Sequence, residues 1–234
     1  YNYDTETPQD VSVNHVILTG NESSYGAGVY GDNVTVKNST VSNNTIDSDG
    51  AVYAQTSALV EDSTFRNNSS GDEGAGVYVN DDGAADYDLV VKDSEFVNND
   101  GLGYYGGSLT AYNGGAEVRR TSVSDSSTAE YGGGLYSDEN AVVSNVVFSN
   151  NTGEYGGGGI YANANLDIRN AVIDQNDSPG SDGGGLYVGG NLSSASNEIT
   201  DNTSNGNGGG VYVGGDVSLL QDVIEGNDSG TSEG

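Results

Sequence analysis

Apolar and polar positions recur along this chain in a unit of roughly 25 residues. Each unit carries a glycine-rich segment followed by an aliphatic residue and a tyrosine, as in residues 208–212 (GGGVY). The tyrosine position falls at residues 30, 53, 78, 110, 136, 161, 187 and 212, with threonine at 110. A second marker is an apolar strand that ends three residues before an asparagine, and only Ser126 breaks this second series. The asparagines are Asn21, Asn44, Asn68, Asn99, Asn151, Asn176, Asn202 and Asn227.

Two markers that share one period predict a repeat protein. No unit contains an amphipathic stretch long enough for a helix, which excludes helical and leucine-rich repeats. Two or three short strands in each unit predict an all-β parallel β-helix (β-solenoid) of about nine turns, stacked at roughly 4.8 Å. The predicted domain limits are an N-terminal extension or cap over residues 1–10, the β-helix over 11–228, and a C-terminal tail over 229–234.

Stacking places the same position of every unit in one column. The aliphatic residues that precede the tyrosines, and the apolar residues that precede the asparagines, are expected to form two inward columns. The asparagines are expected to bond one another from turn to turn and to tolerate left-handed corners. The tyrosines, one residue past an inward column, are expected to point outward as a stacked ladder. That ladder either binds sugar rings or packs on itself and shields the glycine-rich strand.

The charge balance narrows the choice of partners. A formal net charge of −29, from 35 acidic and six basic side chains, excludes nucleic acid, which needs a basic surface. Strong salt would screen the self-repulsion of this surface, which favours a halophilic source; a cation-binding acidic surface in ordinary medium is the alternative. No run approaches the roughly 20 apolar residues of a membrane helix, so no membrane span is expected.

Export and glycosylation follow from a different pattern. The chain holds eleven Asn-x-Ser/Thr acceptors where chance gives about five, which predicts a secreted or cell-surface glycoprotein. The chain opens on Tyr1, and we expect a processed segment whose targeting sequence has been removed. Ladder acceptors such as Asn202 are expected to be too enclosed for modification. The glycosylation candidates are Asn33, Asn38, Asn43, Asn67, Asn150 and Asn191.

One irregular unit is the place to look for a site. It combines an insertion over residues 81–88, a degraded glycine segment over 106–110, Arg119 and Arg120, and the missing asparagine at Ser126. A polysaccharide lyase would need carboxylates that bind a cation and a basic residue that takes a proton. Asp82, Asp86 and Asp88 are the Ca²⁺ candidates, with Arg119 or Arg120 as the base; solvated acidic turns are the alternative.

The negative surface opposes encounter with an acidic polysaccharide, so no enzymatic activity and no obligatory cofactor are expected. The lone His15 has no catalytic neighbour in the first strand and is expected at the surface.

The paired motifs, such as residues 132–135 (GGGL) with Phe148-Ser149-Asn150-Asn151, resemble the repeats of the polymorphic outer membrane proteins and related right-handed parallel β-helix surface proteins. The resemblance covers about Val11 to Asn227 and implies a right-handed β-helix. Members of that broad class act as adhesins and cell-surface stalks, whereas sugar lyases and viral tailspikes share the fold. The chain shows no sign of the membrane barrel of the autotransporting members.

We therefore expect an extracellular structural or adhesive β-helix of a cell surface or filament. Its copies are expected to associate head to tail, because an open solenoid exposes unpaired strand edges. The alternative is a carbohydrate-binding or polysaccharide-degrading β-helix, such as a lyase or a viral tailspike, acting through the irregular unit.

Overall fold

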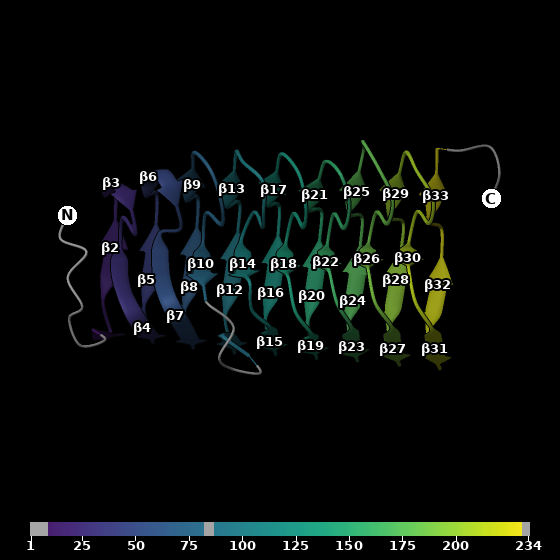
Figure 1. Cartoon of the computed structure of the whole chain (residues 1–234), viewed down its shortest axis with the longest axis horizontal. Coiled ribbons are helices and arrows are strands. Elements are labelled where there is room, and N and C mark those ends of the chain that lie inside the picture. Colours follow the sequence, from purple (N-terminus) through teal and green to yellow (C-terminus); the bar gives the residue numbers. More distant parts are fainter. Residues whose placement is uncertain (1–8, 82–86, 231–234) are drawn as a thin grey trace.

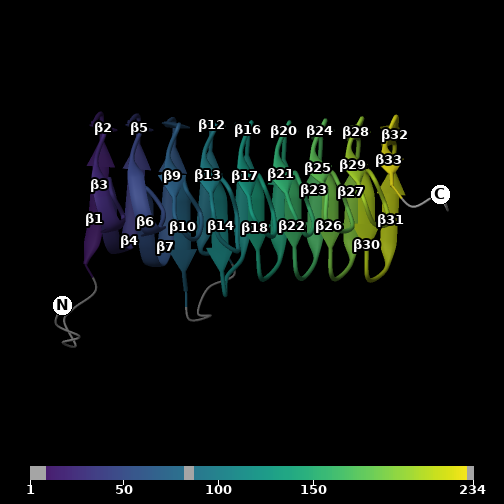
Figure 2. The ribbon, with the colours of Figure 1, turned by 90° about the horizontal axis from the view of Figure 1, so that it is seen from above.

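The computed structural model describes residues 9–81 and 87–230, which form a parallel β-helix with no α-helix among them. The strands lie one above another along a single axis, from the N-terminal end to the C-terminal end of the rod (Figures 1 and 2). Every strand pairing is parallel. The all-β, nine-turn prediction is confirmed, and the strands run from Asp10 to Ser229.

Each complete turn contains four strand positions, and the first two belong to one 15-stranded sheet. The two positions are fused in the long strands β4 (Val29–Lys37) and β7 (Val52–Glu61). The other strands at the first position are β10 (Val77–Asn80), β14 (Leu109–Tyr112), β18 (Leu135–Ser137), β22 (Ile160–Ala162), β26 (Leu186–Val188) and β30 (Val211–Val213). Those at the second position are β1 (Asp10–Asn14), β11 (Leu89–Lys92), β15 (Ala116–Arg119), β19 (Ala141–Ser144), β23 (Leu166–Arg169), β27 (Leu192–Ala195) and β31 (Val217–Leu220).

The third and fourth positions each build a sheet of nine strands. The third contains β2 (Ile17–Thr19), β5 (Thr40–Ser42), β8 (Thr64–Arg66), β12 (Glu95–Val97), β16 (Ser122–Ser124), β20 (Val147–Ser149), β24 (Val172–Asp174), β28 (Glu198–Thr200) and β32 (Val223–Glu225). The fourth contains β3 (Glu22–Tyr25), β6 (Thr45–Asp49), β9 (Ser69–Ser70), β13 (Asp100–Gly101), β17 (Ser127–Thr128), β21 (Thr152–Gly153), β25 (Asp177–Ser178), β29 (Thr203–Ser204) and β33 (Asp228–Ser229).

Pairing in register stacks equivalent residues of successive units, as the period predicts. Tyr30 lies beside Tyr53 and Tyr53 beside Tyr78, while Phe65 lies beside Phe96. Both predicted inward columns are confirmed: the aliphatic residues before the tyrosines and the apolar residues before the asparagines fill the centre of the rod. From Val52 to Leu186 in the first column and from Val41 to Ile199 in the second, these side chains are fully buried. The core is therefore continuous along the axis.

Left-handed backbone marks the corners of each turn. One corner is a glycine such as Gly132, with φ of 71°, where a side chain would be strained. The ladder asparagines do not occupy these left-handed positions, contrary to expectation. The residue just before each of them does, as at Asn67 (φ 54°) and Asn150 (φ 56°). The two roles fall to successive residues, because the residue with positive φ turns the chain at the corner and the asparagine after it points inward.

The inward asparagines bond along the axis as predicted. Asn176 Nδ2 donates to Asn202 Oδ1 at 3.0 Å and to the carbonyl of Phe148 at 3.0 Å. Asn44, Asn68, Asn151 and Asn202 repeat this pattern. In every case the bond between ladder asparagines runs from the amide of one turn to the Oδ1 of the following turn, so the ladder has a direction.

Candidate functional site

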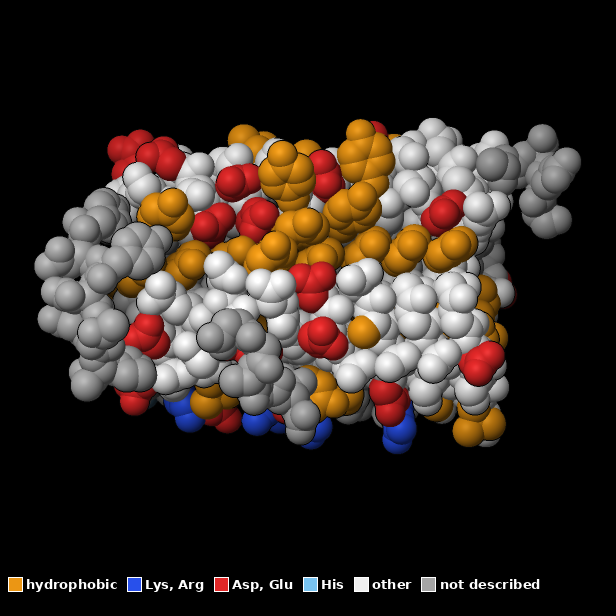
Figure 3. All heavy atoms as spheres, viewed as in Figure 1, with side chains coloured by type: hydrophobic (Ala, Val, Ile, Leu, Met, Phe, Trp, Pro, Cys, Tyr) orange, Lys and Arg blue, Asp and Glu red, His pale blue; other side chains and the backbone are white. Residues whose placement is uncertain are grey.

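A row of stacked tyrosines is the most distinctive surface feature of the rod. Tyr30, Tyr53 and Tyr78 stack at centroid distances of 5.1 and 5.5 Å, and Tyr161 and Tyr187 at 4.4 Å with nearly parallel planes. Figure 3 shows the resulting band of orange side chains along the long axis, with acidic side chains beside it. The predicted ladder of outward tyrosines is confirmed as a stack.

The stack continues through the turn where Thr110 replaces the tyrosine. The ring of Tyr112 lies 6.4 Å from Tyr78 and 5.4 Å from Tyr105. Tyr105 in turn lies 4.4 Å from Tyr136. We call the whole row the tyrosine stack. Its members are Tyr30, Tyr53, Tyr78, Tyr112, Tyr105, Tyr136, Tyr161, Tyr187 and Tyr212.

Three rings of the stack are closed to solvent, and the other inner rings are partly exposed. Tyr53, Tyr78 and Tyr136 are 8%, 4% and 4% exposed. Their faces lie against neighbouring rings, so no face of theirs is open for the ring of a sugar. Of the two interpretations of the ladder, packing of the rings on one another is therefore the one that the structure confirms.

Carboxylates beside the stack accept hydrogen bonds from its phenols. Tyr136 Oη donates to Asp138 Oδ1 at 2.6 Å, and the Tyr78 hydroxyl donates to Glu73. Burial, together with these neighbouring carboxylates, raises the pKa of Tyr78 and of Tyr136 far above the ordinary phenol value. Both phenols therefore stay protonated, with their protons directed at carboxylates.

Two acids on adjacent turns, Asp49 and Glu73, have strongly shifted pKa values. Burial, with help from the charge of Asp72, raises the pKa of Asp49 to about 6. Burial raises the pKa of Glu73 to about 7, against the hydrogen bond from Tyr78, which lowers it. Asp49 and Glu73 pair across neighbouring turns, so each lies next to the charge of the other.

Sequence reasoning missed these acids, although a signal was present. Each stands directly before a corner glycine, in the position that Tyr25, Tyr105 and Tyr131 occupy in other units. Residues in that position lie over the tyrosine stack, as the contacts of Tyr25 with Tyr53 and of Tyr131 with Tyr161 show. An acid there is therefore placed next to a phenol.

The irregular unit contains a compensated exchange within the core. In three later units a glycine (Gly159, Gly185 or Gly210) faces the ladder asparagine of its own turn: a Cβ on Gly185 would lie 2.9 Å from Asn202 Cγ. In the irregular unit Ser108 replaces the glycine and Ser126 replaces the asparagine. Their hydroxyls lie 2.8 Å apart, and Asn99 Nδ2 donates to Ser108 Oγ at 3.2 Å. Two departures from the repeat are thus explained by packing.

The insertion lies between β10 and β11 and is closed by two buried carboxyls. Asp81 and Asp88 are 2% and 1% exposed and share a hydrogen bond. Burial, followed by the neighbouring Asp81, raises the pKa of Asp88 to about 6, although the Gly115 N–H donates to Asp88 Oδ2 at 3.2 Å. One proton shared between the two carboxyls lowers the cost of burying them, while Asp88 Oδ1 is buried without a hydrogen-bond partner among the described residues.

The calcium candidates are only partly covered by the structure. Asp82 and Asp86 lie outside the described residues, and Asp88 faces Asp81. Within residues 9–81 and 87–230, no group of three or more His, Cys, Asp or Glu side chains could hold a metal ion. Calcium binding stays a prediction.

The arginines that the sequence grouped with Asp88 lie elsewhere. Asp88 directly precedes β11, whereas Arg119 pairs with Lys92 at the other end of that strand, about 10 Å along it. Arg119 forms an ion pair with Glu117. The structure does not bring these residues together as a lyase site, because the insertion and the arginines stand at opposite ends of the same strands.

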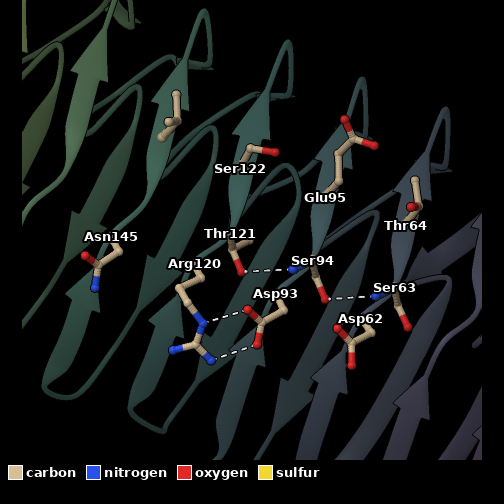
Figure 4. A pocket seen from close by; sticks show the side chains of 11 residues that line it. Asp62, Ser63, Thr64, Asp93, Ser94, Glu95, Arg120, Thr121, Ser122 and Asn145 are labelled. Carbon is tan, nitrogen blue, oxygen red and sulfur yellow. Dashed lines mark hydrogen bonds and ion pairs between the residues drawn. The ribbon is translucent and has the colours of Figure 1, made fainter.

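Arg120 lines a shallow groove of about 690 Å³ at the next corner. It binds Asp93 in a bidentate fork, with Nε and Nη2 at 2.6 and 2.7 Å from the carboxylate oxygens (Figure 4). Behind them, Ser63 N donates to Ser94 Oγ and Ser94 N to Thr121 Oγ1. These hydroxyls form a second polar ladder, which the sequence analysis missed because serine, threonine and other residues share the position. His15 is exposed at the start of the same corner.

The glycosylation candidates differ in accessibility. Asn38, Asn43, Asn67, Asn150 and Asn191 are exposed, whereas Asn33 is partly covered and donates to Asp10 Oδ1 at 2.8 Å. Asn202 is fully buried, in line with its expected enclosure. Modification of any of these asparagines stays a prediction.

Taken together, stacked parallel turns, polar ladders and a continuous apolar core define a β-solenoid. The family model described as "Right handed beta helix region" matches residues 57–228, so the chain belongs to that family. Comparison with curated proteins gave no match, and neither did comparison with solved structures. Among the described residues, no helix is long and apolar enough to cross a membrane.

Proposed function

We propose that this chain is an extracellular structural or adhesive β-helix, N-glycosylated, that associates head to tail into a filament or surface array. The observation that carries this proposal is the exposure of the core columns in the last described turn. In the last turn, Val217 and Ile224 are 52% and 43% exposed, whereas Leu192 and Ile199, one turn earlier, are 1% and 0% exposed. The core columns thus remain open where another turn would cover them.

The asparagine ladder supports stacking in one orientation. At one end, Asn21 donates from N and Nδ2 to Asn44 Oδ1, and its own Oδ1 accepts no bond from the described residues. At the other end, Asn227 Oδ1 accepts from Asn202, and its backbone N–H has no following turn to bond among those residues. Because the ladder has a direction, the end of one copy matches the start of the next.

The surface supports an extracellular setting. The exposed acceptors lie on corners of the rod, where a glycan would project into solvent. The charge of −29 keeps such a rod hydrated and suits strong salt, which would screen repulsion between copies.

Electron microscopy in strong salt and after dilution tests head-to-tail association. We expect fibres with an axial repeat near 40 Å, about nine turns at roughly 4.8 Å each. Val217→Asp, which places a charge on the open end of the core, should abolish the fibres. Val147→Asp on the side wall, where Val147 is 40% exposed, is the matched control and should leave them. Monomers at high salt and high protein concentration would rule the association out.

A separate observation favours carbohydrate binding as a second function. Tyr104 and Tyr155 are 52% and 48% exposed beside the tyrosine stack. Beside them, the carboxylates of Glu130 and Glu154 make no hydrogen bond or ion pair with the described residues, and both residues are partly exposed. Their backbone carbonyls accept from the N–H groups of Tyr155 and Gly180. Open aromatic rings and free carboxylates match the apolar faces and hydroxyl groups of sugars. Retention on immobilised neutral polysaccharide should fall in Tyr104→Ala and Tyr155→Ala but not in Tyr30→Ala; equal retention by all three would exclude this surface.

A further inference from the structure

We propose that the tyrosine stack relays one-electron oxidation along the rod, carrying an electron vacancy from ring to ring between the two ends. This function is separate from mechanical support and from adhesion. It concerns the same nine rings that pack on one another, and its partner is a high-potential one-electron oxidant rather than a macromolecule.

The composition directs any such vacancy to tyrosine. The chain has no cysteine, no methionine and no tryptophan, but it has 16 tyrosines and a single histidine. Tyrosine is the most readily oxidised side chain that remains. A one-electron oxidant that reaches this protein therefore oxidises tyrosine in preference to any other side chain.

The geometry connects the tyrosines over the length of the rod. Electron transfer weakens steeply with distance, so ring contact is the arrangement that favours it. Successive centroids in the tyrosine stack lie between 4.4 Å, at Tyr105 and Tyr136, and 6.4 Å, at Tyr78 and Tyr112. Tyr112 and Tyr105 keep the row unbroken at Thr110, the one unit in which the repeat lacks its tyrosine.

The carboxylates supply what the oxidation of a phenol requires. When an external oxidant removes one electron from Tyr136, its hydroxyl proton passes to Asp138 Oδ1, 2.6 Å away, and a neutral tyrosyl radical remains. An electron from the next ring then reduces this radical, and Asp138 returns the proton to the Tyr136 oxygen. The next ring is left as a phenol radical cation that keeps its proton, and an electron from the ring beyond it reduces it in turn. Above a pH of about 7, where Glu73 is ionised, Tyr78 and Glu73 are arranged for the same exchange. At the far end, an external reductant supplies the final electron.

Burial separates part of this route from solvent, while its start is open. Tyr30 is 51% exposed, and Tyr53 and Tyr78 behind it are 8% and 4% exposed. A radical on Tyr53 or Tyr78 is therefore shielded from reactions with dissolved molecules, whereas Tyr30 is accessible to an oxidant.

Much of the row is single file, and its contact between Tyr112 and Tyr105 is a narrow point in the middle at which the relay can be tested. Among the described residues, the contact between Tyr112 and Tyr105 is the single ring contact joining the N-terminal tyrosines to the C-terminal ones. Beyond it the route divides, because Tyr105 contacts both Tyr136 and Tyr131, and each of these contacts Tyr161. Removing the phenols at the narrow point should stop the relay, whereas removing Tyr136 leaves a way round.

The experiment uses the absence of natural cysteine. Gln9→Cys places a unique thiol at an exposed residue whose carbonyl accepts from the Asp32 N–H, two residues from Tyr30. A ruthenium polypyridyl photo-oxidant is attached to this thiol. The full chain is then exposed to a flash of light in the presence of a sacrificial electron acceptor and a spin trap. Peptide mass spectrometry locates the tyrosines that carry the trap. We expect adducts at Tyr212, at the far end, as well as at Tyr30.

The variants distinguish transfer through the tyrosine stack from direct oxidation of each tyrosine by a diffusing oxidant. In Tyr105→Phe with Tyr112→Phe, which keeps the rings packed, adducts at Tyr212 should fall to the level without light while those at Tyr30 persist. Tyr155→Phe, outside the stack, should change neither, and circular dichroism should show all variants folded. The proposal is overturned if Tyr212 adducts survive the double substitution, or if adduct yields follow solvent exposure wherever the oxidant is attached.

Discussion

Three acidic side chains make the stability of the folded protein depend on pH. Burial raises the pKa of Asp49 and of Asp88 to about 6, and that of Glu73 to about 7. Each carboxyl therefore binds its proton more tightly in the folded chain than in the unfolded chain. Its stabilising effect is complete below the unfolded pKa, near 4, and is lost as the pH rises through the folded pKa.

We therefore expect the melting temperature to fall as the pH rises from about 4 to about 7, at constant high salt. Repulsion among the other acids acts in the same direction, so variants must separate the two contributions. Replacing all three residues (Asp49→Asn, Glu73→Gln, Asp88→Asn) should flatten the slope. Asp93→Asn is the control, because Arg120 lowers rather than raises the pKa of Asp93. A melting temperature that climbs over this pH range would contradict the assignment.

At the scale of strands and ladders, the sequence predicted the features that recur in every unit, and it did not predict those whose residues change from unit to unit. The columns that begin at Val29 and Val41 were predictable, because a β-helix converts a constant spacing in sequence into direct stacking. The ladder through Ser63, Ser94 and Thr121 was not, since its position changes residue type from turn to turn. Asp138, which accepts from Tyr136, follows directly after β18 at a position that also changes residue type from unit to unit, so the repeat does not predict that bond.

The compensated exchange at Ser108 and Ser126 shows that an irregular unit is not by itself a site. Ser108→Gly removes the hydroxyl that accepts from Asn99 and meets Ser126. Ser126→Asn brings an amide against the Ser108 side chain, where other units have glycine. Each single substitution should lower the free energy of unfolding by about 1–3 kcal/mol, while the double variant should recover most of that loss.

Chemical denaturation of the unsubstituted protein, the two single variants and the double variant measures the coupling between Ser108 and Ser126. Ser108→Gly combined with Asn202→Ser, a pair whose members lie in different turns, is the control and should be additive. Additive losses in the Ser108 and Ser126 pair would mean that the two serines do not compensate each other.

At the scale of the whole rod, the large negative charge is a property that the repeat fold itself does not require. Stacking each position on its neighbour also stacks acids. Four of the six basic residues are already paired: Lys37 with Glu61, Arg119 with Glu117, Arg120 with Asp93, and Arg169 with Asp167. The remaining carboxylates repel one another along the full length of the molecule. Folding holds them closer together than the unfolded chain does, so repulsion opposes the folded state.

Added salt should therefore stabilise this protein strongly. At molar ionic strength the Debye length shrinks to about 3 Å, less than the distance between turns, so acids in neighbouring turns cease to repel. We expect the melting temperature to rise continuously between about 0.1 and 1 M KCl. Sucrose of equal osmolality is the control for non-ionic effects and should give a smaller rise. A melting temperature that does not respond to KCl would show that the acidic surface has another purpose, such as binding a specific cation, and would remove the physical basis for a halophilic source.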